Sequence, residues 1–416
     1  DAAFTLATRT LDPPVSRLPN EEPQPLDSDG WLTNSLKARA AELYQRNQTV
    51  FRSGLHFERD SGTSGYSDLT MLTWMNEVSF PAQGGVVTLR TDSVCYDTGS
   101  LGGDYQSFGT REEWIGDHSF SPVNSDFGQS VAFIWEGEQL SFDIGTTPMG
   151  MIYSDVSAGV SWRWDWRDFG FRLEGYYRPE TGSLLAIGGQ RDPNTGLTWG
   201  GVRRLGASIN LSHDLGGKNG FWARASIESI KGHHVADNYG LQLMGGWYHR
   251  LINLPNRRTL TGLSAFFWQY GKDLSDYHWG QGGYYSPKHA YSAGLMLDEA
   301  RRYANWSWQL RGQLGISAST SSSYDRYHAK NSIRPYPLPD IDAQYSDDSS
   351  VELGVSLYGA VERRLTRRVI VGAAMSYQNS DEYAPFYAGL WLRWSLTDWL
   401  GDLALPPTPM TPYAQR

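Results

Sequence analysis

The chain has 416 residues, among them 17 Trp, 24 Tyr, 15 Phe and 45 Gly, and it carries a net charge of −9. This acidic balance argues against nucleic acid as a partner, because nucleic-acid binding needs basic surface to neutralise phosphates. The sequence contains no run of about 18 apolar residues, which excludes transmembrane helices. Membrane-spanning strands escape this test, because half of their residues can face water.

The first 48 residues differ in composition from the rest. Residues 1–27 are rich in Pro and acidic side chains and are expected to form a linker or an exposed tail. Residues 28–47 follow a capping Ser28 or Asp29 and carry an apolar stripe at helical spacing, formed by Leu32, Leu36, Ala40 and Leu43. This lone amphipathic helix is expected to be the last helix of an upstream α-solenoid, or else a small periplasmic plug helix. No signal peptide is visible in DAAFTLATRT, so either it was cleaved or the chain is the C-terminal part of a longer protein. The lone helix favours the second of these two explanations.

From Val50 onward, apolar and polar side chains alternate in sixteen stretches of about ten residues. Residues 350–362 show the pattern clearly, because Val351 and Leu353 share one parity while Glu352 and Ser356 share the other. This length suits a tilted crossing of a bilayer, whereas soluble sandwiches usually have strands of about five or six residues. The predicted strands cover residues 50–59, 68–79, 84–93, 128–136, 138–145, 154–165, 169–178, 200–212, 219–230, 239–252, 258–271, 289–299, 304–318, 350–362, 368–379 and 384–397.

The connections between these strands alternate strictly between short and longer. Those at 80–83 and 166–168 are short, for example, whereas those at 94–127 and 319–349 are long. Short periplasmic turns and long extracellular loops give this pattern in outer-membrane barrels. The predicted fold class is therefore all-β, a sixteen-stranded antiparallel transmembrane β-barrel over residues 49–400, located in the bacterial outer membrane.

Residues 401–416, GDLALPPTPMTPYAQR, are too rich in Pro to form a further strand. They follow the last strand on the short-turn side and are predicted to form a periplasmic C-terminal tail. Most outer-membrane barrels end at their last strand, so an added tail suggests a role in gating or partner docking. The alternative is a frayed end without function.

Placing the apolar parity of each strand toward lipid identifies the side chains that line the lumen. The inner face then carries mixed Arg and Glu, which any water-filled barrel needs, and aromatic rings, which a passive ion porin does not need. Trp and Tyr offer flat apolar faces to the C–H faces of a sugar and polar tips to its hydroxyls. The candidate glycan-binding residues of the lumen are Glu174, Tyr176, Trp222, Glu228, Tyr248, Trp268, Tyr358 and Trp391.

Three of these assignments have alternatives. Trp222 and Trp391 could lie near the rims and complete the aromatic girdle. The strand at 258–271 is ambiguous, because Trp268 shares with its aromatic neighbours the parity of Ser264. The charged residues on the inner face are expected to be mainly structural.

The sequence contains no HExxH, CxxC, GxSxG, P-loop or Rossmann glycine pattern, so no catalytic residue, cofactor or metal site is predicted. His233 and His234 are adjacent in a loop but lack further ligands at suitable spacing, and the loop acids around Asp340 lack the spacing of a calcium site. An enzyme is therefore not expected, and a barrel hydrolase is kept as a minor alternative.

The loop at 272–288 combines Gly and Pro in a way that could let it act as a gate of the pore. Gly280, Gly282 and Gly283 permit positive φ, and Pro287 stiffens the return of the chain. Such a loop could fold over or into the pore mouth, and its candidate gating residues are Tyr284, Tyr285, Ser286, Pro287 and Tyr291. The alternative is an ordinary surface loop with a packed aromatic cluster.

The segment WGQGGYYSPKHAYSAGL at 279–295 resembles the C-terminal barrel domain of the outer-membrane cellulose export channel that belongs to bacterial cellulose synthase systems. In that family a Gly-rich turn precedes an aromatic–Ser–Pro element with a Tyr shortly after it, as in Gly282 to Pro287 and Tyr291 here. The first strands, FRSGLHFERDSGTSGYSDLT, also resemble the opening of that family. The resemblance covers the barrel and implies a periplasmic tetratricopeptide solenoid ahead of sixteen strands, with residues 1–48 as the end of that solenoid.

The resemblance also implies a function and partners. The polymer would be cellulose, pushed by its synthase through a passive conduit that lies in outer-membrane lipid. Periplasmic and inner-membrane cellulose synthase components would be reached through the N-terminal solenoid. One alternative is an exporter of another polymer, such as partly deacetylated poly-N-acetylglucosamine, for which a lumen with an acidic excess is expected. Another is a general diffusion porin, for which no aromatic track is expected.

Overall fold

The computed structural model describes residues 48–100, 108–110, 120–321, 323–336, 338, 340–379, 384–399 and 402–416. The helix predicted at 28–47 lies outside the described residues, as does most of the loop between the third and fourth strands. Across the described ranges, no helix combines the length and the apolar character needed to cross a bilayer.

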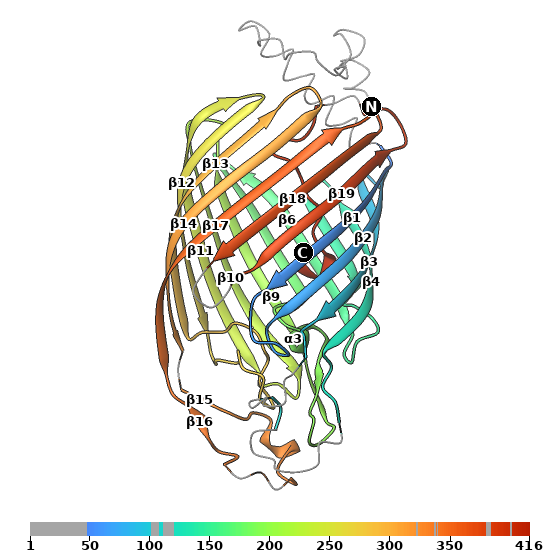
Figure 1. Ribbon diagram of the computed structural model, residues 1–416. Helices are drawn as coiled ribbons and strands as arrows, with labels where there is room; N and C mark the ends of the chain where they lie inside the picture. Colours follow the sequence, from blue (N-terminus) through green and yellow to red (C-terminus); the bar gives the residue numbers. More distant parts are fainter. Residues whose placement is uncertain are drawn as a thin grey trace, which may run out of the picture.

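Sixteen strands form one closed antiparallel sheet (Figure 1). Each strand pairs with the next along the chain, and the last pairs with the first, with Val50 opposite Ser395. Closure pairs every strand edge, as a barrel in hydrocarbon requires. The strands are β1 (Val50–Asp60), β2 (Leu69–Ala82), β3 (Gly85–Asp97), β4 (Ser125–Glu136), β5 (Leu140–Thr146), β6 (Val156–Trp166), β7 (Phe169–Pro179), β9 (Thr198–His213), β10 (Asn219–His233), β11 (Asn238–Leu254), β12 (Arg257–Tyr270), β13 (His289–Arg302), β14 (Trp306–Ser321), β17 (Asp348–Arg364), β18 (Val369–Asn379) and β19 (Phe386–Ser395). The predicted sixteen-stranded barrel is confirmed.

The alternation in the sequence places apolar side chains outside the barrel and polar side chains inside it. On β17, Val351 and Leu353 are 72% and 82% exposed, whereas Glu362, on the other face, is 1% exposed. The outward residues of the other strands continue this apolar belt around the barrel, for example Leu55 on β1 and Leu314 on β14. Such a belt is the surface that a barrel presents to the hydrocarbon of a membrane.

The two ends of the barrel differ, as the connection lengths predict. At the short-turn end, tight turns join the strands, such as Gln83–Gly84 between β2 and β3, where φ is 54° and 74°. A two-residue turn with both φ positive matches the right-handed twist of the strands. At the long-loop end, the connections carry short elements of their own, which gather at the bottom of Figure 1. These are α3 (Leu184–Gly188), β8 (Gln190–Arg191), β15 (Tyr324–Asp325), η3 (Lys330–Ser332) and β16 (Gln344–Tyr345).

The long loops pack around one apolar core, which we call the cap. Within it, the rings of Trp199 and Trp279 are fully buried with centroids 5.5 Å apart. The buried carboxylate of Asp192 accepts hydrogen bonds from the backbone N–H groups of Thr110 (2.9 Å) and Thr195 (3.0 Å), which joins two different loops. The buried core of the cap consists of Phe108, Leu185, Ala186, Trp199, Val202, Ile230, Val235, Leu274, Tyr277, Trp279, Tyr284, Tyr327 and Ile333.

Residues 402–416, which we call the tail, turn back from the short-turn end into the barrel. There η4 (Tyr413–Gln415) lies among lumen-facing side chains, and Figure 1 marks the C-terminus at mid-height of the barrel. The backbone N–H of Tyr413 donates to Asp92 on β3 and its hydroxyl donates to Asp143 on β5, each over 2.7 Å. We expected this segment in the periplasm, because its Pro content excludes a strand but gives no signal for an inward course.

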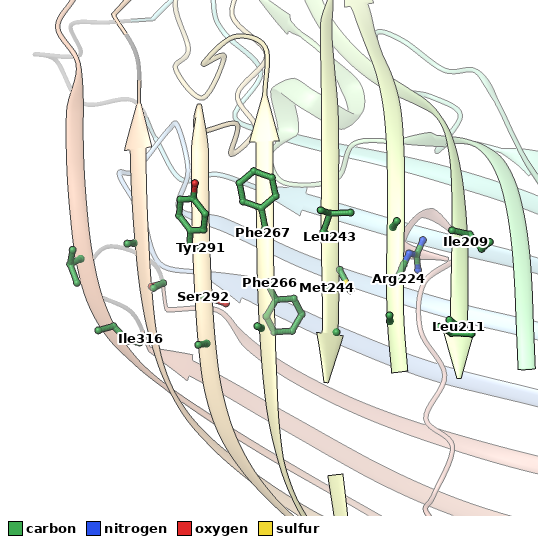
Figure 2. Close-up of a pocket in the computed structure, with 18 of the residues that line it drawn as sticks. Ile209, Leu211, Arg224, Leu243, Met244, Phe266, Phe267, Tyr291, Ser292 and Ile316 are labelled. Atoms are coloured by element: carbon green, nitrogen blue, oxygen red, sulfur yellow. The ribbon is translucent and has the colours of Figure 1, made fainter. Parts of the chain in front are cut away.

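A hollow of about 850 Å³ crosses the outside of the barrel from β7 to β17 (Figure 2). Small side chains such as Ala223, Ala265 and Ala293 line it, with larger side chains around them. Among the larger ones, Leu243 and Tyr291 are 43% and 54% exposed on the outer face of the sheet. The hollow therefore belongs to the surface that faces lipid.

Candidate functional site

The lumen face of β7, β9 and β10 carries an ionic network around Glu174. Its carboxylate lies 2.7 Å from Arg172 Nε and 3.4 Å from Arg224 Nη2, and it accepts a hydrogen bond from Ser208 Oγ at 2.9 Å. The side chains of Arg172 and Glu174 are 43% and 17% exposed. Both therefore keep polar atoms available to a ligand in the lumen.

Glu228, by contrast, is buried in the wall, where it contacts Arg204 and Tyr176. Its side chain is 2% exposed, and its carboxylate lies 3.6 Å from Arg204 Nη1. Tyr176, which is half-buried, donates its hydroxyl to Glu228 at 2.6 Å. Glu228 thus fixes the Tyr176 ring in the wall, and the ring is the part of this pair that a ligand can reach.

Aromatic side chains form a row on the lumen side of β10 and β12, which we call the aromatic ladder. The ring centroids of Trp222 and Phe266 are 6.3 Å apart, and Phe266 stacks on Trp268 at 5.6 Å with an interplanar angle of 11°. Tyr270 follows and approaches Tyr284 of the cap at 6.4 Å. The ladder thus leads along the wall toward the cap.

The ladder settles the ambiguous parity of β12 and adds two residues to the candidate set. Trp268 faces the lumen together with Phe266 and Tyr270, while Phe267 faces outward and lies 5.1 Å from Tyr291. Sequence reasoning named Trp268 but not Phe266 and Tyr270, and it left the parity of this strand ambiguous because all three share it with Ser264. Ser264, which shares their parity, was the available signal for an inward face.

Tyr248 lies at the short-turn end of this wall. Its hydroxyl donates to Asp214, in the turn after β9, and Arg250 donates to the same carboxylate. The hydrogen bond from Arg250 holds the pKa of Asp214 well below its ordinary value. Tyr248 is therefore part of the mouth of the lumen.

The wall around β19 also carries an aromatic residue, Trp391, which lies under the tail. Trp391 donates its indole N–H to Glu362 at 3.1 Å and is 5% exposed. It packs in one cluster with Met75 of β2 and Met410 of the tail, against which the half-buried Tyr358 also packs. Trp391 is thus inside the barrel, as its parity predicts, but under the tail.

The candidate gating residues take different places. Tyr284 is 3% exposed in the cap core and accepts a hydrogen bond from Asn238 Nδ2 at 3.0 Å. Burial raises the pKa of the Tyr284 hydroxyl, so it stays neutral. Ser286 accepts a hydrogen bond from the backbone N–H of Leu274 (2.8 Å), and the carbonyl of Pro287 accepts one from Tyr270 (3.3 Å). These three residues fasten the loop at 272–288 into the cap.

The other two gating candidates lie apart from the cap core. Tyr285 is 63% exposed. Tyr291 is the third residue of β13 and lines the lipid-facing hollow, as Figure 2 shows. Within the described ranges, no cluster of three or more His, Cys, Asp or Glu side chains could hold a metal ion.

Comparisons with known proteins add a relationship over nearly the whole chain. A family model described as the cellulose synthase operon protein C C-terminus matches residues 67–397. The cellulose synthase operon protein C of Salmonella typhimurium is 39% identical over 398 residues, which cover 93% of this chain and 33% of that protein. The protein of the same name from Escherichia coli strain K12 is 38% identical over 397 residues, which cover 93% and 34%. This chain thus spans about a third of the length of these curated relatives.

Among solved structures, a bacterial polysaccharide outer membrane secretin superposes with a TM-score of 0.52 at 10% sequence identity. The match covers 85% of this chain and 99% of that chain. At this identity the likeness shows a shared fold.

Proposed function

This chain belongs to the family of the C-terminal region of cellulose synthase operon protein C, and we propose that it is the channel through which a growing exopolysaccharide, cellulose foremost, leaves the periplasm. The barrel lies in the bacterial outer membrane, with its apolar belt in lipid. Because the curated relatives are about three times as long as this chain, the polymer and the partners are part of the proposal.

The observation that carries this function is the aromatic ladder on the inner wall. A β-linked glucan presents C–H groups on the flat faces of its rings and hydroxyls at their edges. Trp222, Phe266 and Trp268 offer apolar faces in series, and Arg172 and Glu174 on β7, two strands from β10, offer partners for hydroxyls. A lumen that passed only ions and water would gain nothing from such a row.

The ladder also suits movement rather than capture. Each ring contributes about 0.5–1.5 kcal/mol of stacking, so a polymer that slides exchanges one weak contact for the next. Conduction needs sites that are favourable enough to enter and weak enough to leave. The channel is then a passive conduit, and the synthase supplies the force as it extends the chain.

The cap is the gate in this scheme. Its core closes over the long-loop end, where the polymer would leave the cell. Tyr284 and Ser286 fasten the loop at 272–288 into that core, so the gate opens when this loop separates from its neighbours. The short-turn end faces the periplasm, where residues ahead of β1 would connect to the solenoid and to the other synthase components.

The second candidate is an exporter of a cationic glycan such as partly deacetylated poly-N-acetylglucosamine. Such a polymer would favour a lumen wall with an excess of carboxylates. Around the ladder, Glu174 and Glu228 are instead matched by Arg172, Arg204 and Arg224. This balance favours a neutral glycan.

The test is single-channel current through the purified barrel, titrated with cello-oligosaccharides and, separately, with glucosamine oligomers. Block by cello-oligosaccharides alone is the expected result. Block by the cationic oligomers alone would move the function to the second candidate. A large steady current that neither oligomer changes would identify a diffusion porin and end the proposal.

A further inference from the structure

The tail is held inside the lumen along its whole described length. Near its start, Arg302 Nη1 donates to the carbonyl of Leu403 at 2.9 Å and Ser307 Oγ donates to that of Ala404 at 2.5 Å. Farther along, the side chain of Met410 is 4% exposed in its cluster with Met75 and Trp391. The tail thus starts beside β13 and β14 and crosses to the wall formed by β19, β1 and β2.

The end of the tail binds a set of buried charges on β3, β5 and β7, which we call the tail socket and which consists of Arg90, Asp92, Asp143 and Arg178. These four residues are 8%, 4%, 8% and 6% exposed. Arg90 Nε lies 2.7 Å from Asp92, and Arg178 holds Asp143 at the same distance. Buried ion pairs need further hydrogen bonds to offset the loss of water.

The tail supplies those hydrogen bonds. Arg90 donates to the carbonyl of Thr411, and Asp92 and Asp143 accept from the N–H and the hydroxyl of Tyr413. Arg178 lies over the Tyr413 ring with its guanidinium carbon 5.5 Å from the ring centre. The socket and the tail are therefore matched in charge and in hydrogen-bonding geometry.

The wall is also shaped to receive the tail. A Cβ atom added to Gly145 would lie 2.6 Å from Cε1 of Tyr413, and one added to Gly54 would lie 3.2 Å from the sulfur of Met410. Contacts this close leave little or no room for a side chain on the wall. Glycine on β1 and β5 thus lets the tail lie directly against the sheet.

The aromatic ladder lies opposite the wall that Met410 covers. Met410 packs against β1, β2 and β19, whereas Trp222, Phe266 and Trp268 are on β10 and β12, about halfway round the closed sheet. The socket, on β3, β5 and β7, lies between these two walls. The rings of Trp222, Phe266 and Trp268 remain half-buried rather than buried. A space of about 360 Å³ is lined by Gln415 and Arg416 of the tail and by Arg172, Glu174 and Tyr176 of the wall.

We propose that the tail forms a second, inner wall that divides the lumen and confines the polysaccharide to the side of the aromatic ladder. The confinement of a glycan rests on the proposed function, whereas the division of the lumen does not. Trp391, which is 5% exposed under the tail, then takes no part in guiding the polymer. The tail acts as a positioning element, since it presses the glucan toward Trp222, Phe266 and Trp268 instead of binding it.

The test is the rate at which a maleimide labels single cysteines in the whole chain, purified in detergent. Phe266→Cys and Trp391→Cys are made in a Cys95→Ser background, since Cys95 is the one native cysteine. With the tail present, Trp391→Cys should react about tenfold more slowly than Phe266→Cys, because reaction requires access to the thiol. Deletion of residues 408–416 should remove most of this difference by accelerating Trp391→Cys alone.

Cello-oligosaccharide added before the maleimide then tests the path of the polymer. It should slow the labelling of Phe266→Cys and leave Trp391→Cys unchanged while the tail is present. If the deletion fails to fold, as judged by heat-modifiable migration on gels, Tyr413→Ala replaces it, since this change removes both the ring and the hydroxyl from the socket.

The outcomes separate the two claims. Equal labelling of the two positions with the tail present would overturn the division of the lumen. Protection of Trp391→Cys equal to that of Phe266→Cys would overturn the confinement. Unequal labelling without protection by cello-oligosaccharide at either position would support the division of the lumen. It would contradict the proposed function and therefore also the confinement of the polysaccharide.

Discussion

Arg178 on β7 grips Asp143 on β5 through two hydrogen bonds of 2.7 Å each, one from each terminal nitrogen to each carboxylate oxygen. Both side chains are 8% exposed, and the hydroxyl of Tyr413 in the tail donates to the same carboxylate. Because of this pairing, both the guanidinium of Arg178 and the carboxylate of Asp143 have a partner of opposite charge in the wall.

Replacing Arg178 by Met should strongly destabilise the barrel. The change leaves the carboxylate of Asp143 buried without its countercharge, which costs about 3–5 kcal/mol. The measurement is the free energy of unfolding in urea from lipid vesicles.

The matched control is Arg172→Met, whose partner Glu174 lies at the open lumen face, and this change should cost no more than about 1 kcal/mol. Adding Asp143→Asn to Arg178→Met should recover part of the loss. Equal stability of the two Arg variants would contradict this assignment.

Tyr284→Ala should loosen the cap and lengthen the open state of the channel. Truncating a buried aromatic side chain costs about 3–5 kcal/mol, and here Asn238 also loses its hydrogen-bond acceptor. The control is Tyr285→Ala, since that neighbouring ring is 63% exposed and outside the cap core. Open probability in single-channel recordings is the measurement. Indistinguishable gating of the two variants would remove Tyr284 from the gate.

Phe266→Ala should weaken block by cello-oligosaccharides about two- to tenfold, the equivalent of one lost stacking contact. The neighbouring Phe267→Ala deletes the same side chain from the outer face of the same strand and should leave block unchanged. Both variants are titrated in the single-channel assay. If the outward substitution has the larger effect, the ladder is not the glycan path.

The cap should lose stability as the pH falls from about 6.5 to about 4. Burial, and then the positive charge of Lys272, lower the pKa of His328 to about 4. Asp325 opposes this shift and Lys330 adds to it. Because the opened loop binds the proton more tightly than the folded cap does, protonation favours opening below the ordinary His pKa of 6.5.

Hydrogen exchange of the cap amides over this pH range is the measurement for His328. The change His328→Gln removes the titrating group and should flatten the dependence between these two pH values. Cap exchange that depends on pH equally in both proteins, after correction for intrinsic exchange rates, would assign the effect to another group.

The barrel was predictable because its signal is local and periodic. Each strand must present apolar side chains to lipid and polar ones to water, so the alternation within β17 or β18 already states which residues face the lumen. The same rule would have placed Tyr291 outside the barrel, since it shares the parity of Leu295 and Leu297 on β13. Tyr291 was grouped with the gate because it follows the aromatic–Ser–Pro element of the family motif and offers a ring for stacking.

The course of the tail was not predictable, because its contacts are neither local nor periodic. Tyr413 bonds to Asp92 and Asp143, which lie 321 and 270 residues away in the chain. The sequence pattern of an extended Pro-rich segment is the same whether the segment is exposed to solvent or lies inside a barrel. The cap is similar, since its core combines residues from several loops that are far apart in sequence.

The tail is joined covalently to β19, so its binding to the socket is an intramolecular equilibrium. A short tether gives a bound segment an effective concentration in the millimolar range, which no periplasmic competitor at ordinary abundance matches. Contacts at Met410 and Tyr413 that would be too weak to retain a free peptide are therefore enough to keep this one in place. If the tail detaches, it therefore rebinds without having to be recruited from solution, and the division of the lumen is restored.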